Sequence, residues 1–329
     1  VGVVMFFAIS GYLVMQSRLR TDNVIQFAWR RALRIFPALW LLVLVSVFVA
    51  GPLLSRFSVV EYFSSPTTYT YLRTLFLQNN SPILPGVFEN NPLQPGFNGS
   101  LWTLPIEAKC YLALALFGLA HQRWMKLALV ASAAILAAII VFHITRGAFR
   151  VNYFASDSYS VGKLVSPFLF GAVVAAWRLE RWLSPRLFAV LSLFGLTLCL
   201  VTEGALTFMW SLVALAIGGL ALALGLRNDR LLSRLSPKSD YSYGLYLYAF
   251  PVQQALIAAY PAISPWMLIA ATTAITLTFA MLSWHVVEQP FLALKSTPSL
   301  RIAFHTPSTR LVATAFAALL VSTGAYGAW

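Results

Sequence analysis

The chain of 329 residues is strongly apolar and also basic, and these two properties narrow its class. Hydrophobic residues make up 59% of it and charged residues only 10%, with a mean hydropathy of +0.76 and a net charge of +13. Soluble globular proteins carry about 25% charged residues, so this composition excludes an ordinary soluble protein. It predicts an integral membrane protein.

The apolar residues fall into ten segments of about the length that a bilayer core of about 30 Å requires. We predict an all-α integral membrane protein with about ten transmembrane helices in one bundle. Residues 1–294 would form the membrane domain, and 295–329 a cytosolic linker with a candidate additional span. The ten segments are 1–15, 35–54, 100–120, 124–142, 161–177, 187–201, 205–226, 241–259, 266–287 and 311–328.

The basic residues are distributed unevenly between alternate connections. If the connection after the first segment is cytosolic, most of the 23 Lys and Arg residues lie on the cytosolic side. This is the positive-inside pattern of multi-pass membrane proteins. The charge therefore indicates topology and contact with membrane lipid, with no nucleic-acid partner, and it places the long connection 55–99 outside.

The connection 55–99 is much longer than ordinary loops between helices and contains five prolines. Long loops in compact proteins are commonly lids or binding elements. Apolar residues recur at helical spacing over 69–78, which favours a short interfacial helix there. The alternative is a disordered loop.

Glu107 lies about two turns inside the apolar segment 100–120, where an ionised side chain costs several kcal/mol unless it has a partner or a function. At α-helical spacing, Ser100, Thr103, Glu107 and Tyr111 share one face, so we predict a polar stripe on a spanning helix. Pro105, two residues earlier, would interrupt that span. Two interpretations of Glu107 stay open: a functional carboxylate, or a structural one bonded to a neighbouring helix.

Neither the two cysteines nor the four histidines have the spacing of a metal site. We therefore expect no disulfide and no metal.

Four short patterns occur in a fixed order and carry a resemblance to a known family. They are VMFFAISGYL at 4–13, FAWRRALRIFPA at 27–38, SLWTLPIE at 100–107, and SYGLYLYAFP at 242–251 followed by VEQP at 287–290. Together they resemble the acyltransferase-3 family of multispan membrane O-acyltransferases, over nearly the whole of 1–294.

The resemblance implies a ten-span protein of a bacterial-type cytoplasmic membrane that takes an acyl group, usually acetyl, from cytosolic acyl-CoA. The acceptor would be a hydroxyl of a carbohydrate or of a lipid-linked glycan precursor. Two departures matter. The family's catalytic His lies in a first span that would precede Val1, so we expect a preceding helix that this chain does not contain. Where the family often has His, this chain has Ala249.

Arg31 and Arg34 are three residues apart and share a helix face at the predicted cytosolic boundary. Two guanidinium groups there suit the phosphates of acyl-CoA, and with the resemblance we predict donor binding. The alternative is an ordinary positive-inside anchor. Glu288 could pair with these arginines, or simply mark a helix end before Pro290.

The predicted catalytic residues are Glu107 and Tyr111 on the first stripe, and Ser242 and Tyr246 on a second polar face that also includes Gln253. Acyl transfer to a hydroxyl needs a base and a dipole for the developing oxyanion, and these side chains offer both. Two rival interpretations are an exporter or flippase of polysaccharide or lipid-linked sugar, and an inactive homologue.

Overall fold

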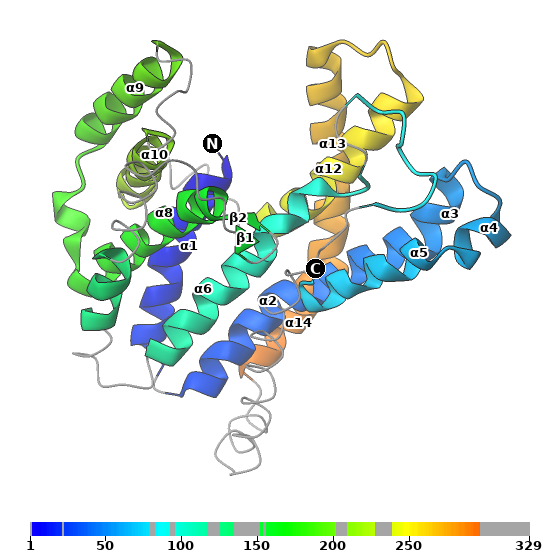
Figure 1. Cartoon of the computed structure of the whole chain (residues 1–329). Helices are drawn as coiled ribbons and strands as arrows, with labels where there is room; N and C mark the ends of the chain where they lie inside the picture. Colours follow the sequence, from blue (N-terminus) through cyan, green and yellow to red (C-terminus); the bar gives the residue numbers. More distant parts are fainter. Residues whose placement is uncertain are drawn as a thin grey trace. The chain divides into compact units, whose positions relative to one another are not determined.

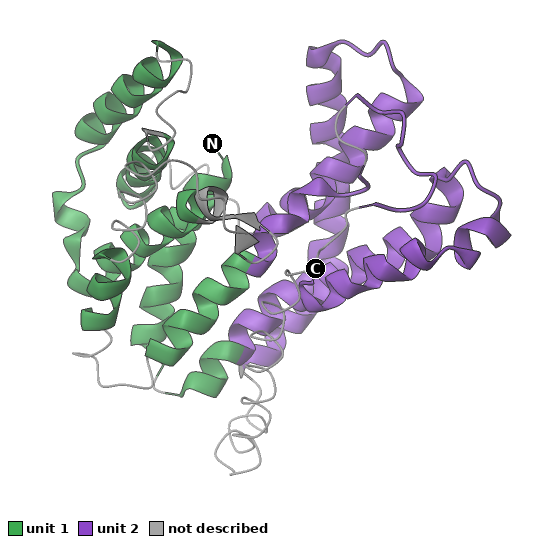
Figure 2. Cartoon of the chain, in the orientation of Figure 1, with its two compact units in different colours: residues 1–28, 106–236, 310–329 green, residues 29–105, 237–309 purple. Residues whose placement is uncertain are grey.

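The computed structural model describes residues 2–21, 23–78, 83–92, 96–117, 126–134, 152–153, 156–201, 209–227 and 239–296. Most of these residues are helical (Figure 1). The described residues also include one antiparallel pair of two-residue strands, β1 (Asn152–Tyr153) and β2 (Ser156–Asp157). The chain divides into two compact units (Figure 2). Unit 1 comprises 1–28, 106–236 and 310–329, and unit 2 comprises 29–105 and 237–309.

Three helices of the described chain are long and apolar enough to cross a membrane: Gly2–Leu19, Val24–Leu54 and Pro265–Ala293. Shorter apolar helices cover Gly162–Trp177, Pro185–Val201 and Trp210–Gly225. An all-α membrane protein is therefore confirmed, while the number of ten spans stays a prediction. The segment predicted at 311–328 lies outside the described residues, as does most of 124–142, of which 126–134 is helical.

Unit 1 is built around α1, which packs against α8 and α10, while α10 also contacts α8 and α9. Its helices are α1 (Gly2–Leu19), most of α6 (Leu104–Phe117), α8 (Ser158–Trp177), the 3-10 helix Leu179–Trp182, α9 (Pro185–Val201) and α10 (Met209–Gly225).

Glycines allow α1 and α8 to approach backbone to backbone. A Cβ added to Gly171 would lie 2.0 Å from the carbonyl oxygen of Ala8, and one added to Gly11 would lie 2.0 Å from that of Phe168. Small residues at such crossings are the usual means of tight helix packing in membranes. Gly11 lies directly after Ser10, so the same contact fixes the position of a polar side chain in the site described below.

Gly171→Ala is expected to destabilise unit 1 by about 1–3 kcal/mol, because the added methyl group meets backbone that cannot move aside. The matched control is Gly162→Ala in the same helix, where an added Cβ meets nothing within 4 Å. Thermal unfolding of the purified protein in detergent measures both. Equal melting temperatures for the two variants would contradict the close-packing account.

Unit 2 contains one long helix, a helical pair and the long connection. From Trp29 onward α2 (Val24–Val45) continues through the π-helical turn Ser46–Ala50 into α3 (Gly51–Leu54). The pair is α12 (Ser242–Ala259) packed on α13 (Pro265–Ser283), with Gly244 against Ala280. The chain then passes through the π-helical turn Trp284–Glu288, α14 (Gln289–Ala293) and the 3-10 turn Leu294–Ser296.

The connection 55–99 is folded wherever it is described. It forms α4 (Val59–Ser64), α5 (Pro66–Thr70), the 3-10 helix Tyr71–Phe76 and, at its end, the 3-10 helix Gly99–Thr103. The short helix predicted at 69–78 is present as α5 and the 3-10 helix after it, which together cover 66–76, and its interfacial position stays a prediction. The alternative of a disordered loop is wrong for this part of the connection.

This connection returns along α2 in the opposite direction. The Tyr62 hydroxyl donates to the carbonyl of Val47 (3.1 Å), and the Trp40 indole donates to the carbonyl of Leu75 (3.0 Å). The connection therefore runs from residue 62 to residue 75 along the continuous helix Val24–Leu54, from its residue 47 back to its residue 40.

Two prolines do not act as the sequence predicts. Pro105 does not interrupt a span, because it is the second residue of α6, where a helix tolerates a missing N–H. Pro290 does not end a helix either. The π-helical turn before it shifts the hydrogen-bond register, and the helix continues to Ala293. Pro167 and Pro251 lie inside α8 and α12.

Candidate functional site

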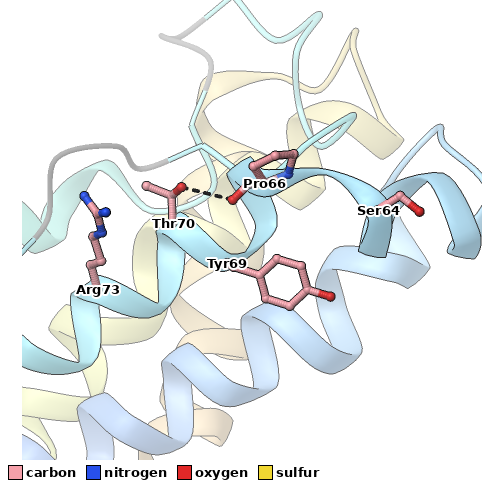
Figure 3. Close-up of a pocket in the computed structure, with 5 residues that line it drawn as sticks. All are labelled: Ser64, Pro66, Tyr69, Thr70 and Arg73. Atoms are coloured by element: carbon pink, nitrogen blue, oxygen red, sulfur yellow. Dashed lines mark hydrogen bonds between the residues drawn. The ribbon is translucent and has the colours of Figure 1, made fainter.

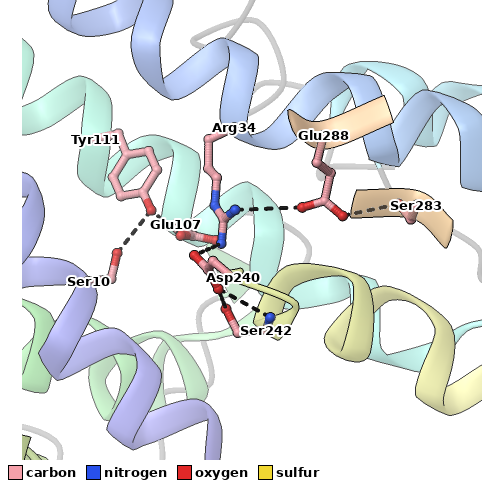
Figure 4. Close-up of polar contacts among 8 residues, drawn as sticks. All are labelled: Ser10, Arg34, Glu107, Tyr111, Asp240, Ser242, Ser283 and Glu288. Atoms are coloured by element: carbon pink, nitrogen blue, oxygen red, sulfur yellow. Dashed lines mark hydrogen bonds and ion pairs between the residues drawn. The ribbon is translucent and has the colours of Figure 1, made fainter. Parts of the chain in front are cut away.

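In unit 1 the predicted carboxylate Glu107 is buried, with 4% of its surface exposed. It lies in the first turn of α6, where the helix dipole favours a negative charge. Tyr111, one turn further along, donates its hydroxyl to the Glu107 carboxylate (Figure 4). The predicted pairing of these two residues on one helix face is therefore confirmed as a direct hydrogen bond.

Ser10 of α1 extends this pair into a chain of three groups. Its Oγ lies 2.9 Å from the Tyr111 hydroxyl oxygen, and Ser10 is buried as well. A phenol has one proton, which Tyr111 gives to Glu107, so Ser10 must be the donor to Tyr111. The result is a directed relay, Ser10 to Tyr111 to Glu107, that can hold or pass a proton at the carboxylate. Ser10 belongs to the motif at 4–13 but is not among the residues that the sequence predicts for the site.

The other two residues of the predicted stripe, Ser100 and Thr103, lie in the 3-10 helix Gly99–Thr103 and belong to unit 2. Residues three apart eclipse in a 3-10 helix, so these two side chains share a face. There the Thr103 hydroxyl lies 2.5 Å from the Tyr246 hydroxyl, and Tyr246 donates to the carbonyl of Ser100. Ser100 and Thr103 are thus both hydrogen-bonded to Tyr246 of α12, and a single stripe of all four residues stays a prediction.

The second predicted face on α12 is also divided. Ser242 is exposed and donates from its backbone N–H (3.2 Å) and its hydroxyl (2.5 Å) to Asp240, which marks it as a helix-start residue. Gln254, rather than Gln253, is the buried amide of this helix. It accepts from Asn91 (3.1 Å) and donates to the carbonyl of Gly96 (3.2 Å). Of the face, Tyr246 alone reaches the segment that begins at Gly99.

Arg34 is the centre of a charged network in unit 2 (Figure 4). Its guanidinium lies 2.7 Å from Asp240 and 3.6 Å from Glu288, and it stacks over the Tyr243 ring at 5.5 Å. Glu288 is 2% exposed and also accepts from Ser283 (3.1 Å). Pairing of Glu288 with an arginine is thus confirmed, and its interpretation as a helix end is wrong.

More positive charge gathers around this network than the two carboxylates balance. The pKa of Lys295 is lowered to about 8, first by burial and then by the positive charges of Arg31, Arg34 and Arg30. The influence of these arginines means that Lys295, which lies in the predicted linker 295–329, belongs to the same cluster as the predicted donor residues. Such a cluster can bind phosphate groups.

Asp240 had a signal in the sequence, because Asp shortly before an apolar helix is typical of a helix start. Lys295 had none, since its proximity to the arginines depends on how the chain folds. Within the described ranges, no three His, Cys, Asp or Glu side chains gather as a potential metal site.

Comparison with known proteins shows the family to which the chain belongs. The family model described as an acyltransferase domain matches residues 1–285. The chain is 31% identical to an O-acetyl transferase of Shigella phage Sf6 over 309 residues, which cover 92% of this chain and 87% of that protein. It is 29% identical to Nodulation protein 10 of Rhizobium leguminosarum bv. viciae over 320 residues, which cover 90% and 83%.

No solved structure matches the chain. The family match covers most of the chain and agrees with the ordered motifs and the membrane-type helices. The chain therefore belongs to the acyltransferase-3 family, as an enzyme that transfers acyl groups other than amino-acyl groups.

Proposed function

We propose that this protein transfers an acetyl group from cytosolic acetyl-CoA to a hydroxyl of a carbohydrate or a cell-surface glycan precursor, in a bacterial-type cytoplasmic membrane. The observation that carries the proposal is the buried relay of Ser10, Tyr111 and Glu107 in a chain that matches an acyltransferase family over 1–285. The relative named O-acetyl transferase supports acetyl as the group.

The basic cluster of Arg30, Arg31, Arg34 and Lys295 is the proposed donor site. Phosphate groups of acetyl-CoA are anionic, and guanidinium and ammonium donors bind them with charge-assisted hydrogen bonds. Arg34 already holds two carboxylates, so we assign the main phosphate contacts to Arg31 and Lys295 and a positioning role to Arg34.

The relay around Glu107 is the proposed site of proton handling. In the reaction the acceptor oxygen attacks the thioester carbonyl, the C–S bond breaks, and CoA leaves as a thiolate. The proton of the acceptor hydroxyl must be taken up, and the thiolate gains one on release. Glu107 would receive or orient that proton, while Tyr111 and Ser10 hold the carboxylate in place.

The family match favours the enzyme over an exporter or flippase. The two are separated by incubating membrane vesicles that carry the intact protein with acetyl-CoA labelled in its acetyl group. We expect base-labile label in the carbohydrate fraction. Carbohydrate that crosses the membrane without label would favour the exporter. If no label is transferred and no carbohydrate crosses, the chain is an inactive homologue.

The donor site makes a prediction about pH. Lys295 has a pKa of about 8 and is therefore protonated below pH 8 and neutral above it, while the donor's phosphates stay charged. The KM for acetyl-CoA is expected to rise about tenfold from pH 7 to pH 9, the value of one charge-assisted contact. Lys295→Arg keeps its charge and should flatten the rise. An equally steep rise in that variant would remove Lys295 from the donor site.

A further inference from the structure

A pocket of about 460 Å³ lies on the long connection, and none of its lining residues belongs to the relay or to the basic cluster (Figure 3). This volume is in the range of about 300–1,000 Å³ that is common for small-ligand sites. Its lining comes entirely from α4, α5 and the following 3-10 helix: Ser64, Pro66, Tyr69, Thr70 and Arg73.

Four of these residues form one row. Tyr69, Thr70 and Arg73 lie three, four and seven residues after Pro66, the spacing of one face of α5 and of the 3-10 helix that continues it. Tyr69 is half-exposed, and its hydroxyl donates to the carbonyl of Phe63 (2.9 Å), which fixes the ring. The pocket therefore offers a fixed aromatic face beside the rigid ring of Pro66.

The hydroxyls of the pocket are hydrogen-bond acceptors toward a ligand. Thr70 donates its proton to the carbonyl of Pro66 (3.0 Å), and Ser64 donates to that of Val60 (2.7 Å), so each oxygen keeps lone pairs but no available proton. In the described part of the chain, the exposed side chain of Arg73 has no hydrogen-bond or ion-pair partner. Its five N–H groups are the pocket's donors.

This set of groups selects against a phosphate and in favour of a sugar. A phosphate needs several donors, and here the two hydroxyls have already given their protons away. A sugar ring both donates and accepts through its hydroxyls, and its C–H face packs against an aromatic ring. The forked guanidinium matches two neighbouring ring hydroxyls.

We propose that this pocket binds a sugar ring of the acceptor glycan, with Tyr69 under the ring and Arg73 on its hydroxyls. The proposal rests on the proposed function and on the outer placement of the connection 55–99 that the distribution of basic residues predicts. The pocket lies between Tyr62 and Leu75, on the segment that returns along α2.

The test uses the intact protein in membrane vesicles and, as acceptor, carbohydrate extracted from the producing cells and freed of its acyl groups by mild base. Tyr69→Leu and Arg73→Gln should each raise the KM for this carbohydrate about tenfold, while kcat and the KM for acetyl-CoA change less than about twofold. Tyr69→Phe keeps the ring and should stay within about threefold of the unaltered protein.

Matched controls come from the same connection. Arg56→Gln removes an equal charge from a residue that pairs with Glu89 outside the pocket, and Phe76→Leu removes an exposed ring nearby. Both should leave the acceptor KM unchanged. The proposal is overturned if Arg73→Gln behaves like Arg56→Gln, or if the donor KM moves as far as the acceptor KM.

Direct binding separates this proposal from the proposed function. Saturation-transfer NMR with the same de-acylated carbohydrate should show contact with the unaltered protein and a loss of it in Tyr69→Leu and Arg73→Gln. Binding with this pattern but without acetyl transfer would support the sugar site and contradict the transferase. Acetyl transfer together with unchanged binding in both variants would support the transferase and contradict the sugar site.

Discussion

Glu107→Gln is expected to reduce acetyl transfer by about 10²- to 10³-fold while leaving the protein folded and inserted in the membrane. The carboxylate is buried and accepts from Tyr111, so the change keeps the size of the side chain and removes its charge and basicity. A group that handles the proton or stabilises charge in the transition state is typically worth a few kcal/mol. Turnover at equal expression in membrane vesicles is the measurement.

A comparison with Tyr111→Phe separates catalysis from structure. Removing the hydroxyl breaks the relay to Ser10 but leaves the carboxylate, so a smaller loss is expected. Both variants should melt within a few degrees of the unaltered protein, because a Gln amide can still accept from Tyr111. Unchanged turnover in Glu107→Gln would leave the carboxylate a purely structural role.

Arg34→Gln is expected to destabilise unit 2 by about 3 kcal/mol, in addition to weakening donor binding. The change leaves Glu288, which is 2% exposed, without its ion-pair partner in a buried position. Removing one partner of a buried pair typically costs 3–5 kcal/mol, and the partial exposure of Arg34 places this case at the lower end. Thermal unfolding in detergent measures the loss.

The double variant Arg34→Gln with Glu288→Gln should recover most of that stability, because no uncompensated charge remains. Arg31→Gln is the matched control of equal charge change, and it should raise the KM for acetyl-CoA with a smaller loss of stability. If Arg34→Gln and Arg31→Gln shift the melting temperature equally, Arg34 is not the residue that neutralises Glu288.

The sequence alone was enough for the class of the protein and for the pairing of Glu107 with Tyr111. Long apolar segments of this kind form membrane helices, because in hydrocarbon every backbone N–H and C=O group must find its hydrogen-bond partner within the segment. Residues four apart within one α-helix are neighbours by local geometry, and both residues lie in α6. The ordered motifs predicted the family that the comparisons show.

The sequence patterns assume a uniform α-helix at two points where the structure has another helix type. Gly99–Thr103 is a 3-10 helix, and a π-helical turn precedes Pro290, whose helix continues to Ala293. Helix type at these points depends on local hydrogen-bond register, which apolar periodicity does not report. The sequence pattern also selected Gln253 where the buried amide is Gln254, an error of one residue in a phase that only packing sets.

The sequence by itself determined the membrane class, the family, the buried carboxylate and its partner one turn away, because each depends on composition, on ordered motifs or on local spacing. Only the tertiary structure joined Ser10 to Tyr111, 101 residues apart, placed Asp240 and Glu288 on Arg34, and brought Lys295 to the arginines. It also formed the pocket of Tyr69 and Arg73 on a folded connection. The physical reason is that contacts between distant segments are decided by close packing, here at Gly11 and Gly171, and by the pairing of buried charge, neither of which leaves a periodic signal along the chain.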